Sequence, residues 1–309
     1  MPVTSGTYSA NSLWVESVDD EDNLRTFTFT DKNGRVILKK VQVGATAGLA
    51  IGDWLWTYYV YDDLGNLRVV IPPKAIPILS PNSWNSATST NTALANALYY
   101  RYTYDSRGRM VEKRVPGKEV EFLIYDNQNR LVATQDALQR VNSSWTYSKY
   151  DALGRVILTG IITQQGTRAS VQALITGNNN SVLSTTATPT TSGGWPSSLG
   201  EILTVNYYDN YAALSSFAYI KPASPHTGFH DNDLNIIGLL AGKKVKNYAS
   251  NSLLTTVYYY DSKGREIQSV KQHHLSNNVR TSIKYNFENG YLINSLNGKN
   301  FFFFVFFEE

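Results

Sequence analysis

The chain of 309 residues contains no cysteine, and only 17% of its residues are charged. Without cysteine it can form neither a disulfide nor a thiolate zinc site. The net charge of +3 is spread along the chain, so no basic stripe indicates a nucleic-acid partner. No apolar run reaches the roughly 18 residues that a membrane span needs. Met1–Ser5 shows no basic region leading into an apolar core, so no signal peptide is predicted.

Apolar and aromatic residues are plentiful instead. Hydrophobic residues make up 42% of the chain, and 21 residues are tyrosine. This composition favours a β-rich protein with long, half-buried strands. No shift in composition divides the sequence, so we expect one continuous β domain over residues 1–300.

One unit of sequence is written three times between Tyr104 and Thr159. Each copy reads aromatic, Asp, two variable residues, Gly or Asn, Arg, and then an apolar run, and the starts lie 21 and 25 residues apart. Self-similarity at this period marks a repeat architecture. The three copies begin at Tyr104, Tyr125 and Tyr150; two more begin at Tyr61 and Tyr260, and worn copies lie at Phe29, Tyr208 and Tyr285.

The unit has the pattern of a β-hairpin turn. The tyrosine ends one strand, and the Asp side chain can accept a bond from a backbone N–H two residues on. The Gly falls where a three-residue hairpin loop needs a left-handed residue, and Asn129 is the accepted substitute in the middle copy. The residues assigned to these turns are Tyr61, Asp62, Gly65, Tyr104, Asp105, Gly108, Arg109, Tyr125, Asp126, Asn129, Arg130, Tyr150, Asp151, Gly154, Arg155, Tyr260, Asp261, Gly264 and Arg265.

The arginine that follows each turn has two possible roles. It can cover an aromatic face of the neighbouring hairpin, or it can point into water. The sequence leaves both open.

Segments between the copies are expected to be insertions, at about residues 74–98, 163–203 and 212–250. Short helices are expected near Thr92–Leu98 and Ser170–Ile175. The Phe-rich tail, residues 301–309, either packs under other elements or marks where a reading frame broke off. The predicted fold is all-β, with consecutive antiparallel hairpins in one long, curved, spiralling sheet.

Candidate sites are few. His226, His230, Asp231 and Asp233 crowd one loop, but their spacing matches no zinc pattern, and the calcium-loop pattern that starts at Asp231 fails at Ile236. Gly238–Lys244 resembles a phosphate loop that is one residue short. We therefore predict no metal site, no cofactor site and no catalytic residue. An Asp placed equally in every turn favours a structural cap over a catalytic carboxylate.

The repeated unit resembles the YD repeat of bacterial Rhs proteins, of the shell of Tc insecticidal toxin complexes and of animal teneurins. Wider stretches resemble Rhs-family proteins of Bacteroidetes: Asp62–Pro73, Arg107–Glu119 and Lys149–Val156. The resemblance covers roughly residues 20–285. It implies a sheet that spirals into a hollow shell around a C-terminal toxin cargo, in a secreted or cell-surface bacterial protein. The chain shows neither the motif and self-cleaving aspartyl site that end such shells nor a cargo domain, so we expect a shell segment or a truncated product.

Three functions compete at this stage. The first is a non-enzymatic segment of an Rhs-type shell, with the remainder of the shell and the toxin cargo as partners. The second is a module that binds a cell-surface glycan or protein through exposed aromatics such as Trp54, Trp56 and Trp145. The third, which the repeated Asp residues disfavour, is a hydrolase.

The assignment of Gly154 to a left-handed position predicts the effect of a substitution. Gly154→Val should destabilise the fold by about 1–2 kcal/mol or more, because a β-branched residue resists positive φ. Chemical denaturation measures this change, and an unchanged midpoint would show that Gly154 does not adopt that conformation.

Overall fold

The computed structural model describes residues 8–46, 48, 50–79, 89–177, 194–222, 229–273, 278–285, 293–296 and 299–302. The expected copy that begins at Tyr285 lies outside the described residues after Tyr285 itself. Most of the Phe-rich tail and His226 also lie outside them. Two compact units can be separated: residues 1–123 with 134–141, and residues 124–133 with 142–309. The single repeat domain over residues 1–300 stays a prediction.

The fold is all-β, as expected, with short helices inserted between strands. The first unit contains strands β1 (Trp14–Asp19), β2 (Arg25–Thr30), β3 (Val36–Gln42), β4 (Trp54–Tyr61), β5 (Leu67–Ile71), β6 (Tyr100–Tyr104) and β7 (Met110–Arg114). It also contains the short helices η1 (Ile51–Asp53), η2 (Pro73–Ala75), α1 (Ile76–Leu79), α2 (Ser89–Leu98) and α3 (Ala137–Val141). Strands β8 (Glu121–Tyr125) and β9 (Leu131–Gln135) are divided between the two units.

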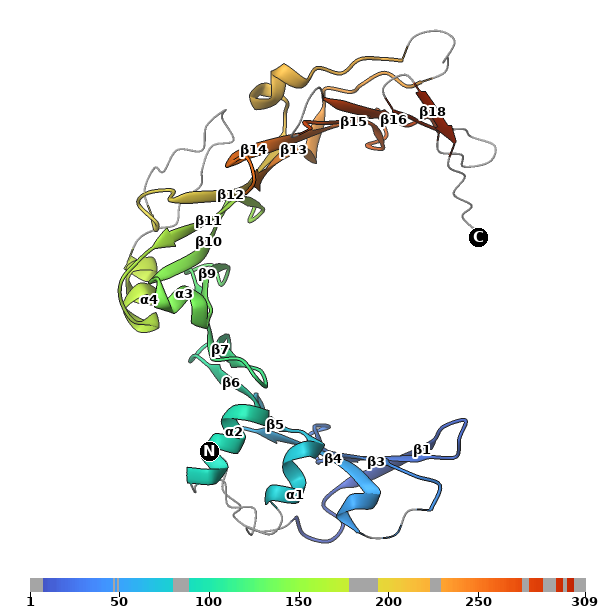
Figure 1. Ribbon diagram of the computed structural model, residues 1–309, viewed down its shortest axis with the longest axis vertical. Coiled ribbons are helices and arrows are strands. Elements are labelled where there is room, and N and C mark those ends of the chain that lie inside the picture. The colour runs from blue at the N-terminus through green and yellow to red at the C-terminus, as the bar shows by residue number, and fades with distance from the viewer. Residues whose placement is uncertain are drawn as a thin grey trace. The chain divides into compact units, whose positions relative to one another are not determined.

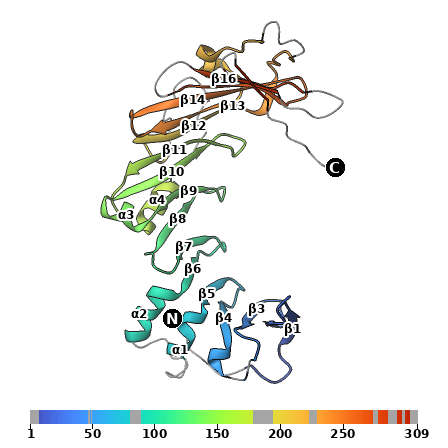
Figure 2. The same cartoon turned by 45° about the vertical axis from the view of Figure 1, so that its right-hand side comes forward.

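The second unit continues the same plan. Its strands are β10 (Ser144–Tyr150), β11 (Val156–Thr163), β12 (Glu201–Asp209), β13 (Ile236–Asn247), β14 (Ser252–Tyr260), β15 (Glu266–Lys271), β16 (Val279–Ser282), β17 (Ile293–Leu296) and β18 (Lys299–Phe302). Helix α4 (Arg168–Gly177) follows β11, and the 3-10 helix η4 (Ala212–Phe217) follows β12. Figures 1 and 2 show the two units, and in Figure 2 strands β10 to β14 lie side by side in chain order.

Strands that follow one another in sequence pair antiparallel within each unit. The register shifts by one residue beside the turns at Asp31, Asp62, Asp105, Asp151 and Asp261, for example between Lys149 and Tyr150 and between Tyr259 and Tyr260. Such a bulge is what a three-residue loop with a left-handed residue produces. The repeated unit of sequence is therefore a hairpin with one fixed turn.

The insertion after β5 folds back onto its own sheet. Ile76 and Leu79 of α1 and Ala95 of α2 are buried against Val69 and Ile71 of β5. Trp56 and Tyr58 of β4 pack against this cluster and remain partly exposed. The helix expected near Thr92–Leu98 is thus present as part of α2, and it covers the sheet.

The insertion after β11 covers a second set of strands. Trp145 and Tyr147 of β10 are 0% and 1% exposed. The Trp195 ring meets the Tyr147 ring edge-on, with their centroids 6.3 Å apart. Helix α4, which includes the expected Ser170–Ile175 turn, buries Val171 and Ile175.

A third insertion lies between β12 and β13. Its Tyr211 ring stacks on Tyr259 of β14 with centroids 4.8 Å apart, and Tyr219 meets the same ring at 5.6 Å. The insertion expected over 212–250 is shorter than the sequence suggested, because β13 already begins at Ile236. Strand β13 therefore includes the whole of Gly238–Lys244. Among the described residues, no helix is both long and apolar enough to cross a bilayer.

Candidate functional site: the repeated turn and its contact with the next hairpin

The Asp of each repeat organises its turn through one carboxylate oxygen. Oδ1 of Asp151 accepts bonds from the backbone N–H groups of Leu153 at 2.9 Å and Arg155 at 2.8 Å. The Asp151 N–H donates to the Arg155 carbonyl at 2.9 Å, and the Gly154 N–H donates to the Asp151 carbonyl at 3.1 Å. The same set of bonds surrounds Asp31, Asp62, Asp105, Asp126 and Asp261.

The residue three positions after this Asp has positive φ in every complete copy. Gly154 lies at φ 81°, and Asn129, the one residue here with a Cβ, lies at φ 63°. Gly65, Gly108 and Gly264 lie at 84°, 74° and 74°. A Cβ on Gly154 would meet no atom within 4 Å, so the backbone conformation alone selects glycine there.

The arginine of the repeat returns to its own Asp. Arg155 Nε lies 2.6 Å from Asp151 Oδ2, and the same pair in the Asp126 turn also measures 2.6 Å. The Asp105 and Asp261 turns repeat it with Arg109 and Arg265 at 2.7 Å and 2.8 Å. Burial raises the pKa of Asp261, but the bonds donated by Arg265 outweigh it and hold that pKa below its ordinary value. The carboxylate is therefore ionised and fully occupied as an acceptor.

The same arginine also covers the tyrosine of the following hairpin. The Arg130 guanidinium carbon lies 4.7 Å from the centroid of the Tyr150 ring, within range of a cation–π contact. Three further pairs, Arg35 with Tyr61, Arg155 with Tyr208 and Arg265 with Tyr285, measure 5.3, 4.3 and 4.4 Å. Of the two roles that the sequence left open, these arginines take the aromatic one. We call this arrangement the Asp–Arg–Tyr link.

The tyrosine closes the contact with its hydroxyl. Tyr150 Oη donates to the Leu131 carbonyl at 2.6 Å, directly after Arg130. Equivalent bonds to the preceding hairpin join Tyr61 to Val36, Tyr104 to Leu67, Tyr208 to Val156 and Tyr285 to Glu266, at 3.0, 3.0, 3.4 and 2.9 Å, and Tyr260 donates to Leu240 at 2.9 Å. Burial raises the pKa of Tyr260 to about 12, so the phenol keeps the proton that it donates.

One full copy lacks the arginine. In the Asp62 turn Asn66 replaces arginine, and its side-chain amide donates to Asp62 Oδ2 at 3.1 Å. Strand β8 ends at Tyr125, whose backbone carbonyl accepts a bond from the Gln172 side chain of α4 at 2.8 Å. A tertiary contact thus occupies the backbone of a repeat tyrosine.

The worn copy at Tyr208 uses its Asp differently. Asp209 has φ 70° and takes no part in a hairpin turn of its own. Its two oxygens accept bonds from Arg155 Nη1 at 2.9 Å and Nη2 at 2.5 Å, and the Gly238 N–H also donates to it at 2.7 Å. The bonds from Arg155 lower the pKa of Asp209 to about 2.

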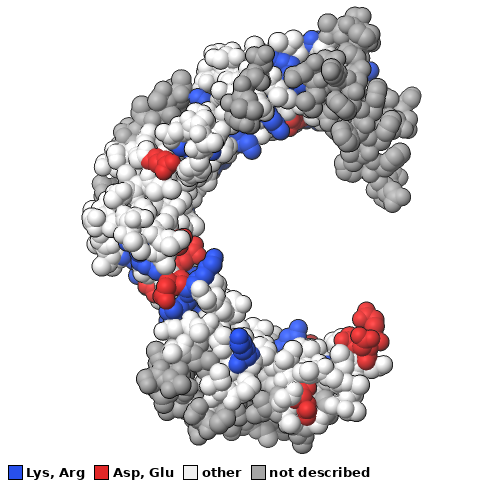
Figure 3. Space-filling model, viewed as in Figure 1, with Lys and Arg blue, Asp and Glu red and all other residues white. Residues whose placement is uncertain are grey.

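One repeat turn is not predicted by the sequence pattern. Asp20 Oδ1 accepts bonds from the N–H groups of Asp22 and Leu24 at 3.0 and 2.8 Å, and Asn23 lies at φ 56°. This is the repeat turn, between β1 and β2, where Figure 3 shows acidic side chains gathered. Leu24 replaces the arginine, so only Asp and Asn at their usual spacing could have revealed the turn. Arg25 instead pairs with Asp19 at 2.7 Å.

The other sequence candidates lie elsewhere. The expectation that Trp145 is exposed is wrong, because its side chain is fully buried and its indole N–H donates to the Gln164 carbonyl at 3.2 Å. Asp231 pairs with Lys221 at 2.7 Å, and the His230 carbonyl accepts a bond from the Tyr219 hydroxyl at 2.7 Å. Gly238–Lys244 lies within strand β13. A phosphate loop is followed directly by a helix, so this segment is not one.

Comparisons with known proteins give structural matches only. No protein-family model matches the chain, and no curated protein matches it. The crystal structure of TcdB2-TccC3 is similar at a TM-score of 0.34 and 13% identity, covering 89% of this chain and 14% of that chain. The structure of a Photorhabdus luminescens Tc holotoxin pore is similar at a TM-score of 0.35 and 14% identity, covering 90% of this chain and 15% of that chain. The chain therefore spans only a small part of the length of these proteins.

The Arg155–Asp209 pair predicts a pH dependence of stability. The folded pKa of Asp209, about 2, lies below the ordinary value near 4, so its contribution is complete above pH 4 and is lost as the pH falls through about 2. Asp209→Asn should cost about 1–2 kcal/mol at pH 6, since partial exposure weakens a charged bond. Urea denaturation of both proteins between pH 6 and pH 2 should show the difference shrinking, and a constant difference would contradict the assignment.

Proposed function

We propose that this chain is a non-enzymatic structural segment of an Rhs-type hollow shell that encloses a C-terminal toxin cargo in the complete protein. The sequence resemblance to YD repeats suggests this role. The observation that carries the proposal is the Asp–Arg–Tyr link, because in four of the described repeats it joins one hairpin to the next.

The geometry supports a wall better than a reaction centre. Asp126, Asp151 and Asp261 are each about 5% exposed, and each carboxylate is engaged by the same backbone and arginine donors. Catalysis by a carboxylate needs one or two residues with a distinct environment. Identical surroundings in several hairpins instead fit a repeat array in which folding stability is shared between neighbouring units.

The insertions add a second property that a wall requires. Helices α1 and α2 pack on Val69 and Ile71 of β5, and Trp195 packs on Tyr147 of β10. Helix α4 buries its own Val171 and Ile175. A well-buried side chain of this kind stabilises by roughly 1.5–3 kcal/mol. The insertions therefore thicken the sheet, and the proposed partners are the remaining shell hairpins and the cargo within. Export as part of a toxin complex belongs to the same proposal.

Limited proteolysis of the complete protein that contains this chain tests the proposal. We expect its C-terminal domain to resist cleavage at least tenfold longer than the same domain produced alone. Gly154→Val, which strains a turn of the wall, should shorten that protection, while Leu153→Ser at the neighbouring exposed position should not. Equal cleavage of the enclosed and isolated domains would overturn the shell function.

A further inference from the structure

Insertions of the second unit pack on one face of its sheet, where Trp195 meets Tyr147 and Tyr211 stacks on Tyr259. Side chains one and three positions before the repeat tyrosine lie on this face, because residues along a strand alternate between the two faces. On strands β10, β12 and β14 they are at most 6% exposed: Tyr147, Lys149, Val205, Tyr207, Val257 and Tyr259. In the second unit this face is therefore buried.

The same face of the first unit is covered only in part. On β2 the equivalent positions are those of Phe27 and Phe29, and directly opposite them on β3 lie Lys40 and Leu38. Helices α1 and α2 pack on the part of this face that β4 and β5 form (Figure 1). Phe27, Phe29, Leu38 and Lys40 remain partly exposed, and we call these four residues the open face.

The two phenylalanine rings are contacted by their own strands. Phe27 and Trp54 of β4 lie with their ring centroids 5.4 Å apart, and Lys40 Nζ lies 5.4 Å from the Phe29 centroid. Within the part of the chain that the structure describes, no ring of an insertion packs on them as Trp195 packs on Tyr147. Exposed apolar surface with a polar rim marks interaction sites on soluble proteins.

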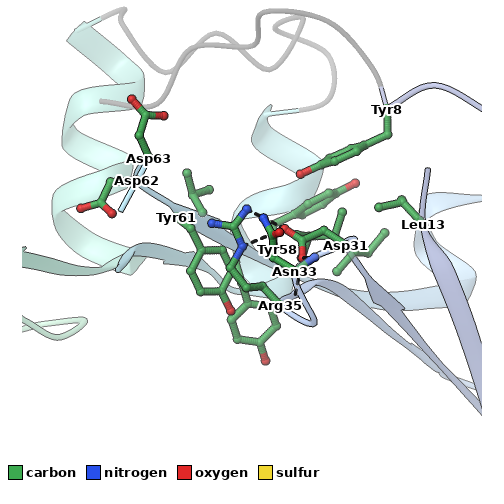
Figure 4. Close-up of a pocket in the computed structure, with 13 residues that line it drawn as sticks. Tyr8, Leu13, Asp31, Asn33, Arg35, Tyr58, Tyr61, Asp62 and Asp63 are labelled. Atoms are coloured by element: carbon green, nitrogen blue, oxygen red, sulfur yellow. Dashed lines mark hydrogen bonds and ion pairs between the residues drawn. The ribbon is translucent and has the colours of Figure 1, made fainter. Parts of the chain in front are cut away.

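Lys40 gives the open face its only charge. Its Nζ lies 3.8 Å from the Trp56 ring centroid, and burial lowers the pKa of this ammonium. Among the described residues it has no ion pair and no hydrogen bond. The acids close to this face are already paired, since Asp19 is held by Arg25 and Asp31 by Arg35 (Figure 4). A half-buried ammonium without an acceptor favours a partner that brings negative charge.

The second unit shows how a polypeptide segment covers a lysine and a ring on this face. Lys149 is 6% exposed, and its Nζ donates to the Pro196 carbonyl at 3.2 Å. The preceding residue, Trp195, places its ring against Tyr147. One short segment thus supplies an oxygen to the ammonium and a ring to the ring. Lys40 and the phenylalanines of the open face present the same two kinds of group.

We propose that the open face is covered by an apolar segment of another polypeptide, which lays an aromatic side chain on the phenylalanine rings and pairs a carboxylate with Lys40. A carboxylate suits Lys40 better than a carbonyl because a charged acceptor forms the stronger bond. A neutral saccharide would leave the ammonium without a counter-charge. The inference does not rest on the shell function, which concerns the Asp–Arg–Tyr link.

Titration of the chain with the peptide acetyl-Trp-Pro-Glu-Leu-amide, followed by NMR, tests this proposal. The matched probe carries glutamine in place of glutamate, and we expect it to bind at least fivefold more weakly. Replacing the peptide's tryptophan by alanine should weaken binding at least fivefold. High salt should narrow the difference between the glutamate and glutamine peptides, because the open face is partly exposed to solvent.

Two neighbouring lysines supply the variants. Lys40→Gln should abolish the preference for the glutamate peptide, and Lys40→Arg should retain it. Lys39→Gln is the control, because Lys39 is exposed and points to the opposite face of β3. Urea denaturation of each variant verifies the fold.

Four outcomes would overturn the proposal. They are equal binding of the glutamate and glutamine peptides, no binding of either peptide, an equal loss of preference in Lys39→Gln and Lys40→Gln, and displacement of the glutamate peptide by a neutral monosaccharide. None of them bears on protease protection of the cargo, so the proposed shell function is tested separately.

Discussion

In four of the described repeat turns the arginine makes two contacts at once, one with its own Asp and one with a tyrosine of the next hairpin. Arg130 neutralises Asp126, which has already ordered its own turn, and lies over Tyr150 of the next hairpin. The Tyr150 hydroxyl then returns to the carbonyl of Leu131. The Arg130 side chain thereby connects its own turn to the next hairpin. Because a cation–π contact is worth more where water is excluded, half-buried Arg130 suits it better than an exposed arginine would.

Stability in such a chain is shared between neighbours. One hairpin cannot bury its aromatic residues alone, and an isolated two-stranded hairpin is marginal in water. Here Tyr147 is covered by Trp195, and Tyr259 lies between Tyr211 and Tyr219. The insertions therefore complete the core where strands alone leave rings uncovered.

The sequence predicted the local structure well because the turn is written in consecutive residues. Asp at one position and Gly or Asn three residues later specify the bonds and the positive φ, and Asn129 follows the rule. Contacts between segments were not readable in this way. The Arg155–Asp209 pair joins residues 54 apart, and Trp195, which meets the Tyr147 ring, lies in an insertion that has no repeat pattern.

The turn at Asp20 shows the limit of a motif defined by all its residues. Leu24 and Asp19 replace the arginine and the tyrosine, so the unit is unrecognisable, although Asp20 and Asn23 alone suffice to build the turn. The turn at Asp20 therefore forms without the arginine and the tyrosine of the repeat. Strand β1, which precedes this turn without the repeat tyrosine and arginine, is exposed at every residue.

A double-mutant cycle between Arg130 and Tyr150 measures the connection most directly. Arg130→Gln and Tyr150→Leu, alone and together, give a coupling free energy in which the separate loss of the Asp126 pair cancels. A favourable coupling of about 0.5–2 kcal/mol is expected from the stacked guanidinium. The cycle between Arg130 and Tyr260, which belongs to a different hairpin, should give none. A coupling of zero between Arg130 and Tyr150 would show that each turn folds without regard to the next hairpin.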